Sequence, residues 1–290
     1  PPRSTLFPYT TLFRSNDNLS YREDAGGLKF ASGFWSLGGE WGNSAAEWEY
    51  GAGRYLNRQE DEWNRLVLAF DDGTTRFTLY RHEGDKSLSQ DSAWGVFESV
   101  YNDRAWGAET SRRFSAAGWD ASLGLAYRDE QMDVEDNYGT DLGGSRDYLA
   151  PFLELSRAFG EVIVELGVRY ETWNVEDGDD QEELTPKLSL GWQAANGNLW
   201  YLSAGRFFAM PSLFELAYFD PWTPTLPSPN LKPEKGYTAD FGVKGTDGRG
   251  SWSAGLFFVS MDDKIEFNNF NPGEPSYVNL SEFRSMGLEA

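Results

Sequence analysis

The stretch that decides the fold reads Trp119-Asp120-Ala121-Ser122-Leu123-Gly124-Leu125-Ala126-Tyr127-Arg128. Side chains of an extended chain alternate between two faces, so Trp119, Leu123 and Tyr127 share one face of this segment. Asp120, Ser122 and Arg128 share the opposite face. This period of two predicts a β-strand with one apolar side and one small or charged side.

The same alternation recurs along the chain, and helical periodicity is nearly absent. Residues 162–171, 186–193 and 237–244 place Val, Leu, Phe or Trp on one face and small or charged side chains on the other. We expect about 14 antiparallel strands after Leu28 and therefore an all-β fold. Before Trp119 the strand centres are less sharply marked, because Asp71-Asp72-Gly73 and Asn102-Asp103 leave the up-down parity open. The expected centres are Leu28, Trp48, Leu66, Phe77, Val96 and Ala108.

Connections between these strands fall into two groups. Residues 115–118, 159–161, 195–198 and 246–250 are short turns, and Asn196-Gly197 is the residue pair that a tight hairpin favours. Residues 131–146, 176–183, 210–234 and 262–276 are predicted to be long loops. Short turns at one end and long loops at the other are typical of an up-and-down β-barrel that crosses a membrane.

Tryptophans mark the expected membrane boundary. Trp119, Trp192, Trp200 and Trp252 flank the short turns and lie on the apolar faces of their strands. An indole with a buried ring and a hydrated N–H suits the headgroup region, so these four residues are predicted to form a girdle. Tyr127, Tyr170 and Trp173 would supply a second belt. The alternative is the core of a soluble β-sandwich, but alternating runs of about 10 residues fit a tilted transmembrane strand better than a soluble strand of about 5 to 6.

Composition excludes several classes of function. The 290 residues carry a net charge of −21, so a basic nucleic-acid-binding face is excluded. The chain has no cysteine and a single histidine, His82, which excludes thiolate sites and multi-histidine zinc sites. Mean hydropathy is −0.57, and no apolar run is long enough for a transmembrane helix.

The two ends of the sequence differ from the rest. Residues 1–15 form a near-mirror in which Arg3 to Phe7 is answered by Thr11 to Ser15, and they resemble a translated sequencing adapter rather than a signal peptide. The C-terminal residues stop in mid-alternation. We therefore expect residues 16–290 to be a partial barrel cut at both ends.

Residues 205–290 resemble the barrel of TonB-dependent outer-membrane receptors. One motif is Phe208-Ala209-Met210-Pro211-Ser212-Leu213, and the second is Asn230-Leu231-Lys232-Pro233-Glu234. The first motif of the family contains an arginine, which is replaced in this sequence, where the element reads Phe208-Ala209-Met210-Pro211. Tyr277-Val278-Asn279-Leu280 and Gly287-Leu288-Glu289-Ala290 follow in the order and spacing of the family. The family's plug domain and TonB box are not in this chain.

The resemblance implies a receptor in the outer membrane of a Gram-negative bacterium that imports a bulky, scarce nutrient. The expected partners are a ferric siderophore or similar ligand, outer-membrane lipid, and TonB acting through the plug region; no nucleic acid and no catalysis are expected. A passive porin-like channel is an alternative. An outer-membrane barrel hydrolase would require His82 to face the lumen near a serine or an aspartate.

Ligand contacts are expected from the long loops. Stiff proline-rich loops can present flat rings and amides to a ligand; the residues predicted to do so are Phe214, Tyr218, Phe219, Trp222, Phe267, Asn268, Asn269 and Phe270. The competing interpretation is that these rings pack the loop onto the barrel rim.

Residues 176–183 form an acidic loop. Asp177, Asp179 and Asp180 could coordinate Ca²⁺, as in some cobalamin receptors of the family, although a solvated charged loop would look the same. No other cofactor is predicted. Haem receptors of the family place a histidine between the two motifs, and residues 212–229 contain none, which argues against haem.

Overall fold

The computed structural model describes residues 20–50, 55–93, 95–139, 141–176, 178–219, 223–247, 250–268 and 271–289. The adapter-like residues 1–15 lie outside these ranges, so that interpretation stays a prediction.

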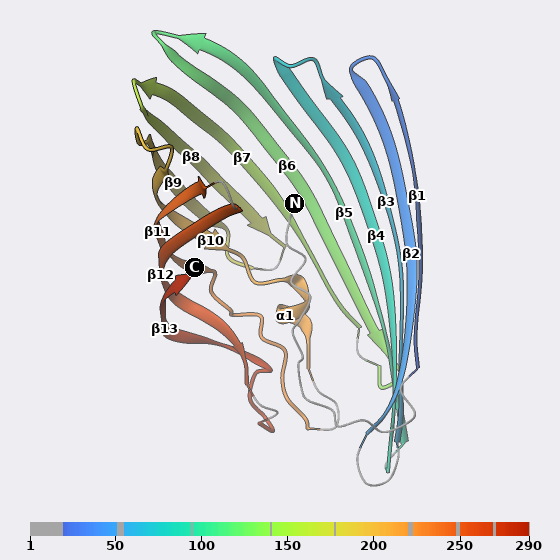
Figure 1. The fold of residues 1–290 in the computed structure, drawn as a ribbon. Coiled ribbons are helices and arrows are strands. Elements are labelled where there is room, and N and C mark those ends of the chain that lie inside the picture. The colour runs from blue at the N-terminus through green and yellow to red at the C-terminus, as the bar shows by residue number, and fades with distance from the viewer. Residues whose placement is uncertain are drawn as a thin grey trace.

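Nearly all described residues lie in long strands (Figure 1). The strands are β1 (Ser20–Ser32), β2 (Trp35–Tyr50), β3 (Tyr55–Asp71), β4 (Thr75–Ser92), β5 (Gly95–Ala116), β6 (Trp119–Asp136), β7 (Asp141–Phe159), β8 (Val162–Val175), β9 (Gln181–Gln193), β10 (Leu199–Ala209), β11 (Glu234–Asp247), β12 (Gly250–Phe267) and β13 (Tyr277–Glu289). One short helix, α1 (Leu213–Ala217), interrupts the series. No helix in the described ranges has the length and apolarity to span a membrane.

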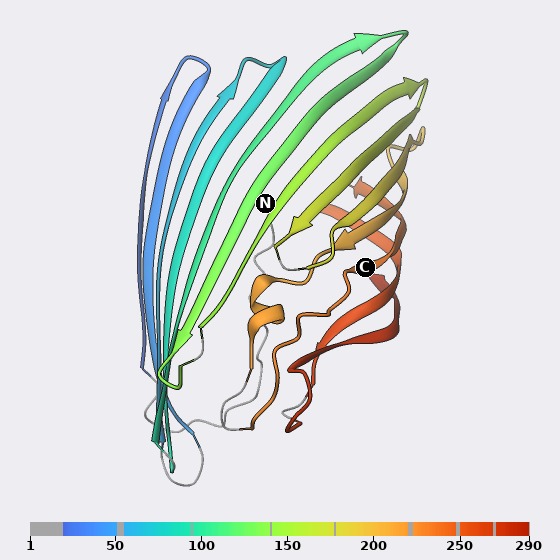
Figure 2. The same cartoon turned by 180° about the vertical axis from the view of Figure 1, so that it is seen from behind.

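These strands form one antiparallel sheet in which each strand pairs with the next along the chain. The sheet curves around α1 and the loop that carries it, as the two opposite views show (Figures 1 and 2). In the described residues, β1 and β13 are its edges. The all-β, up-and-down partial barrel predicted from the sequence is confirmed.

The described sheet has 13 strands, because Val96 and Ala108 belong to one strand, β5. Asn102 and Asp103 do not interrupt it: Asp103 pairs with Gly84, and a Cβ atom at Gly84 would lie 2.4 Å from Asp103 Oδ1. The missing side chain at Gly84 makes room for the Asp103 carboxylate, so the ladder continues.

Two of the predicted long loops are mostly strand. β6 extends to Asp136 and β7 begins at Asp141, so most of residues 131–146 is ladder. β12 extends to Phe267. The strands continue to pair beyond the part that is expected to cross the membrane, which lengthens the hairpins. The polar composition of these segments does not by itself show that they are paired. The short turns are as expected: Gly197 has φ of 84° after Asn196, and the turn between β5 and β6 places Ala117 and Gly118 at positive φ.

The apolar residues lie on the face of the sheet away from α1. Leu123, Phe241 and Leu256 are 55%, 46% and 54% exposed. On the opposite face, Ala126 and Tyr148 belong to a buried cluster with Phe208 and Met210, which lead into the α1 loop. Alternation therefore directs Leu123 outward. A soluble core would have buried it.

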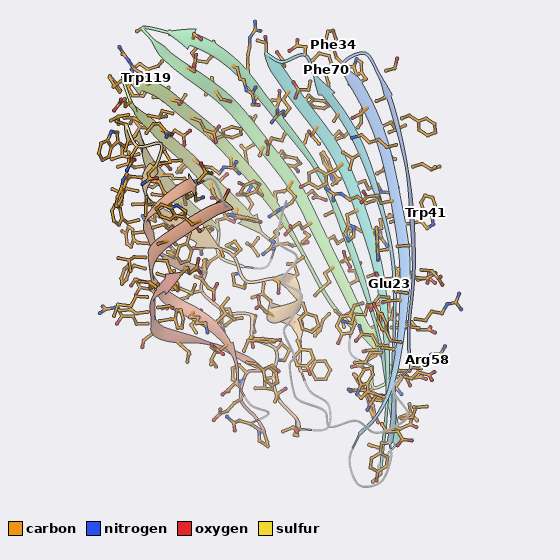
Figure 3. The ribbon with its side chains drawn as sticks, viewed as in Figure 1. Glu23, Phe34, Trp41, Arg58, Phe70 and Trp119 are labelled. Atoms are coloured by element: carbon orange, nitrogen blue, oxygen red, sulfur yellow. The ribbon has the colours of Figure 1, made fainter. Side chains whose placement is uncertain are left out.

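The two ends of the sheet differ in chemistry. Phe34 and Phe70 lie near the short turns with ring centroids 6.1 Å apart, and Trp119 lies at the same end (Figure 3). Glu23 and Arg58 lie toward the other end (Figure 3). Trp192, Trp200 and Trp252 are exposed, whereas Trp119 is half-buried against Phe159 and Arg157. Their role as a membrane girdle stays a prediction.

Trp173 does not join the outer belt. It is only 5% exposed and packs against Tyr148, with ring centroids 4.5 Å apart. Its odd position in β8 shares a face with Arg169 and not with the exposed Tyr170. The prediction placed Trp173 in the outer belt because it is a tryptophan, although the alternation along β8 puts it on the inner face. The prediction for Trp173 was therefore wrong.

Aromatic rings lie over glycines of neighbouring strands. A Cβ at Gly42 would approach the Trp63 ring to 2.6 Å, and one at Gly124 would approach Phe152 to 2.2 Å. The same relation links Gly107 to Tyr80 and Gly242 to Tyr201. These glycines permit the close approach of the rings to the wall.

Candidate functional site

The described residues of the connection between β10 and β11, 210–219 and 223–233, fold onto the concave side of the sheet (Figures 1 and 2). The helix α1 begins with a capping box: the Glu215 N–H donates to Ser212 Oγ at 3.1 Å, and the Ser212 N–H donates to Glu215 Oε2 at 2.7 Å. Two unpaired N–H groups are thereby satisfied, so this five-residue helix has a defined start.

One side of the loop packs onto β5, β6 and β7. Leu213, Phe214 and Ala217 contact a buried cluster of Tyr101, Met132 and Val134. Residues 132 and 134 belong to the segment predicted to be a loop, and their place in β6 provides this apolar support. The helix is therefore held to the wall by burial of apolar surface.

The predicted ligand-binding rings pack against one another. Phe214 lies 5.5 Å from Tyr101 and 5.1 Å from Tyr218, measured between ring centroids. Tyr218 lies 6.1 Å from Tyr277, which lies 5.4 Å from Phe267. This aromatic row, Tyr101-Phe214-Tyr218-Tyr277-Phe267, links β5 to β12 and β13 through the loop. It gives Phe214, Tyr218 and Phe267 a packing role beside any contact they make with a ligand.

The other predicted ligand residues are placed in part. Phe219 is half-buried. Asn268 Nδ2 donates to the Pro275 carbonyl and to Glu274 Oε2, both at 3.0 Å, which closes its own loop. Trp222, Asn269 and Phe270 lie outside the described residues. The ligand-binding role of the whole set stays a prediction.

The second half of the loop is joined to the β12–β13 connection. Leu226 N–H donates to the Glu274 carbonyl and Ser276 N–H donates to the Leu226 carbonyl, both at 2.8 Å. Buried Thr225 and Ser276 share a hydroxyl hydrogen bond of 2.7 Å. These bonds make residues 224–228 and 273–277 a small two-stranded unit.

The two family motifs meet in space. Ala209 pairs with Glu234 at the ends of β10 and β11, although 24 intervening residues separate them. Phe208 carries Lys235 Nζ 5.5 Å above its ring, and Pro211 and Pro233 are buried. Asn230 and Leu231 line a cavity at this junction. The motifs therefore close the base of the loop.

Glu234 is the acidic residue of that junction. Its Oε1 accepts the Ile265 N–H at 2.8 Å. Desolvation raises the pKa of Glu234 above its usual range, and the Ile265 hydrogen bond opposes part of that shift. This carboxylate ties β11 to β12 where both strands reach the loops.

Arg146 lies on the concave face under the loop, and the sequence did not indicate it as a site residue. It is 9% exposed, its Nη1 donates to the Pro211 carbonyl at 2.5 Å, and its Nε contacts Glu130 Oε2 at 2.5 Å. Its guanidinium also lies 4.8 Å from the Trp173 ring centroid. Arg146 therefore joins β7 to the start of the loop. No signal distinguished it, because it lies at the end of a predicted loop.

Further cations lie on the same wall. Arg128 Nε is 2.7 Å from Glu130 Oε1, and Arg169 Nη1 donates to Tyr148 Oη at 3.0 Å. Arg128 also lies 5.1 Å from the Trp173 ring centroid. The face beneath the loop thus combines guanidinium groups with aromatic rings.

The acidic loop is described at Asp179 and Asp180, whereas Asp177 lies outside the described residues. Asp180 Oδ1 accepts the Val175 N–H at 3.3 Å. Within the described residues, no group of three or more His, Cys, Asp or Glu side chains could hold a metal ion. Calcium binding there stays a prediction.

His82 lies on the concave face, in the same alternation as Tyr80. Its Nε2 is 3.3 Å from Asp103 Oδ2. Its cross-strand partners are Arg65 and Ala105, which carry no hydroxyl nucleophile. The condition set for a hydrolase, His82 facing the lumen near an aspartate, is thus met by Asp103, but the residues paired with His82 across the sheet supply no hydroxyl nucleophile. The His82–Asp103 pair joins β4 to β5.

Two of the cavities on the described wall lie at opposite ends of the strands. One of about 550 Å³ lies between the β8–β9 connection and the loop, and Gln181, Pro211, Asn230 and Lys235 are among its lining residues. Another of about 720 Å³ lies near the short turns and includes Asp120, Glu154, Glu165 and Lys187. Both are bordered by charged side chains.

Known proteins share the fold described above. Residues 2–290 match the family model described as TonB dependent receptor-like, beta-barrel. The structure resembles the siderophore receptor PirA from Pseudomonas aeruginosa, with 15% identity and a TM-score of 0.71, over 93% of this chain and 53% of that one. It also resembles the Serratia marcescens hemophore receptor HasR, solved with its hemophore HasA and heme, with 16% identity and a TM-score of 0.69, over 93% and 51%.

A third similar structure is the copper transporter OprC, with 12% identity and a TM-score of 0.70, over 93% of this chain and 49% of that one. This chain thus spans about half the length of each of the three. The names of these three proteins indicate different cargoes, although their fold is shared. The fold alone therefore does not select a ligand. With its outward apolar face and its family match, the chain belongs to the β-barrel of the TonB-dependent receptors, which are outer-membrane proteins.

Proposed function

We propose that this chain is the wall and ligand-binding side of a receptor that takes up a bulky nutrient, with a ferric siderophore as the favoured ligand. The observation that carries the proposal is the large loop held inside the barrel curve by Arg146 at one end and Asn279 at the other. A loop fixed in this way presents a defined surface to a ligand that enters from outside.

The chemistry beneath the loop supports this ligand class. Arg128, Arg169 and the rings of Tyr148 and Trp173 lie on one face. Planar guanidinium groups suit the flat, oxygen-rich groups that chelate iron in catecholate or hydroxamate siderophores, and the buried rings of Tyr148 and Trp173 support the Arg128 guanidinium from below. The proposal that TonB energises this transport rests on family membership, because TonB acts through the plug region.

The test uses the full-length receptor in a Gram-negative strain that lacks its own siderophore receptors. Uptake of radiolabelled iron is measured with ferric catecholate, ferric hydroxamate and haem, and uptake of cobalamin is measured with and without calcium. We expect TonB-dependent uptake of a ferric siderophore. Uptake that is unchanged in a TonB-deficient strain would indicate a passive channel, and uptake of cobalamin alone would replace the ligand.

Two variants separate ligand contact from packing. Phe219→Ala is expected to weaken ligand binding and leave the unfolding temperature unchanged. Phe214→Ala removes a ring of the aromatic row and is expected to lower the unfolding temperature as well. Equal binding by the Phe219→Ala variant and the parent would remove Phe219 from the site.

A further inference from the structure

The strands β9 and β10 pair over only part of their length. Their ladder runs from Leu199↔Gln193 to Gly205↔Lys187. Beyond it, residues 181–186 of β9 remain paired with β8, and residues 206–209 of β10 remain paired with β11. Over these residues β9 therefore pairs only with β8, and β10 pairs only with β11. The β9–β10 ladder has already ended, so the wall has two halves that meet at this boundary.

The ladder ends at a proline. Pro186 follows the last paired residue toward the loop end of β9, and it has no N–H to donate. By contrast, β10 and β11 pair along the whole of β10, from Leu199↔Lys244 to Ala209↔Glu234. The interruption therefore lies between β9 and β10 and not between β10 and β11.

Glu183 closes the interrupted segment with its side chain. Arg206 Nη1 of β10 lies 2.7 Å from Glu183 Oε1, and Lys235 Nζ of β11 lies 3.2 Å from Oε2. The Leu184 N–H donates to Glu183 Oε1 at 3.2 Å. The Glu183 side chain is 8% exposed, so these charge-assisted contacts are little screened by water.

A cavity of about 550 Å³ lies beside this closure. Val175, Asp179 and Gln181 line it from the β8–β9 side. Met210, Pro211 and Lys235 line it from the β10–β11 side. The cavity is therefore bounded by both halves of the wall and by the first residues of the loop.

We propose that residues 181–186 and 206–209 form a seam at which the barrel wall opens, with Glu183 as its closure. Opening the seam breaks the Arg206 and Lys235 ion pairs and draws Pro211 away from Arg146 and Phe208 away from the buried cluster of β6 to β8. It breaks no backbone hydrogen bond of the β9–β10 ladder. The loop begins directly after Ala209, so opening moves its first anchor away from the β8–β9 connection and enlarges the cavity. The seam gives the loop a range of motion without unfolding of a strand.

The experiment measures the distance across the seam in the full-length receptor. This chain has no cysteine, so spin labels attach only at introduced sites once any cysteine outside it is replaced by serine. Asn174→Cys with Ala209→Cys spans the seam; both positions are exposed. Glu161→Cys, in the turn before β8, with Thr246→Cys, near the end of β11, crosses the same β9–β10 boundary at its paired end and serves as the control pair.

In the Glu183→Gln variant, we expect the seam distance to shift by about 5 Å, one strand spacing, while the control distance stays unchanged. Glu282→Gln, which removes an exposed pair with Arg284, is the matched control substitution and should shift neither distance. If Glu183→Gln does not fold, Arg206→Gln, which removes one of the two ion pairs from its half-buried side, should produce the seam shift alone. Equal shifts at both pairs, or no shift in either experiment, would overturn the proposal.

Discussion

Asn279 binds the backbone of Lys232 at both polar groups. Lys232 N–H donates to Asn279 Oδ1 at 2.8 Å, and Asn279 Nδ2 donates to the Lys232 carbonyl at 2.9 Å. The same Nδ2 donates to the Asp263 carbonyl at 2.7 Å. One amide side chain thereby holds the second motif against β12 and β13.

Asn279→Ala should release the end of the loop. Loss of these hydrogen bonds is expected to cost about 1–3 kcal/mol of local stability, because backbone groups of Lys232 and Asp263 lose their partner. Limited proteolysis within residues 218–231 should accelerate. Asn43→Ala, at an exposed position in β2, is the control. Equal cleavage rates in the two variants would contradict the assigned role.

Arg146→Met should destabilise the receptor by about 1–3 kcal/mol, because the Pro211 carbonyl loses its donor and Glu130 keeps only Arg128 as a cationic partner. Chemical denaturation measures the change. The double variant Arg146→Met with Glu130→Gln should recover part of the loss, since the buried carboxylate is then neutral. Arg284→Met, in an exposed pair with Glu282, should cost no more than about 1 kcal/mol.

Gly42→Ala should destabilise the wall by about 1–3 kcal/mol, because the new methyl group would lie 2.6 Å from the Trp63 ring. Gly38→Ala, in the same strand, meets only the Leu28 carbonyl oxygen at 3.9 Å and should be close to neutral. Thermal unfolding in detergent compares them. The close-approach account requires Gly42→Ala to unfold at the lower temperature.

Leu123→Arg should impair membrane insertion. A cation on the lipid-facing side of a barrel costs about 2–4 kcal/mol at mid-membrane, and Leu123 faces away from the concave wall. Ser122→Arg, on the opposite face, should insert normally. Folding into lipid vesicles gives the readout. Equal insertion of both variants would mean that Leu123 does not face lipid.

The β3–β4 turn should lose order in acid. Hydrogen bonds from the Thr75 and Thr74 N–H groups lower the pKa of Asp72 below its ordinary value of 3.8. A lowered pKa means that the stabilisation is complete above the ordinary value and is lost as pH falls through the lower folded value. Exchange of the Thr75 amide should rise in that range. Asp72→Asn should remove this pH dependence.

The sequence predicted the strands best where alternation is unbroken. Trp119 to Arg128 lies within β6, and residues 162–171 lie within β8. It predicted them less well at polar hairpin ends, where Asn102 and Asp103 looked like a break. Ladder hydrogen bonds continue there because Gly84 accommodates Asp103.

The candidate site was predictable only in outline. The motifs located the loop, but its anchors were not visible: Arg146 lies 65 residues from Pro211, and Asn279 lies 47 residues from Lys232. Local pattern carries no information on which distant polar groups will meet. The pairing of Phe214 with Tyr101 depends in the same way on β6 extending far enough to support α1.

The sequence by itself determined that the chain forms a wall of alternating strands with an apolar outer face and belongs among these barrels by its motifs, because side-chain alternation and turn chemistry are local properties. Only the tertiary structure decided the anchoring of the loop by Arg146 and Asn279 and the interruption between β9 and β10. Those features depend on strand register, which brings groups far apart in sequence within hydrogen-bonding distance.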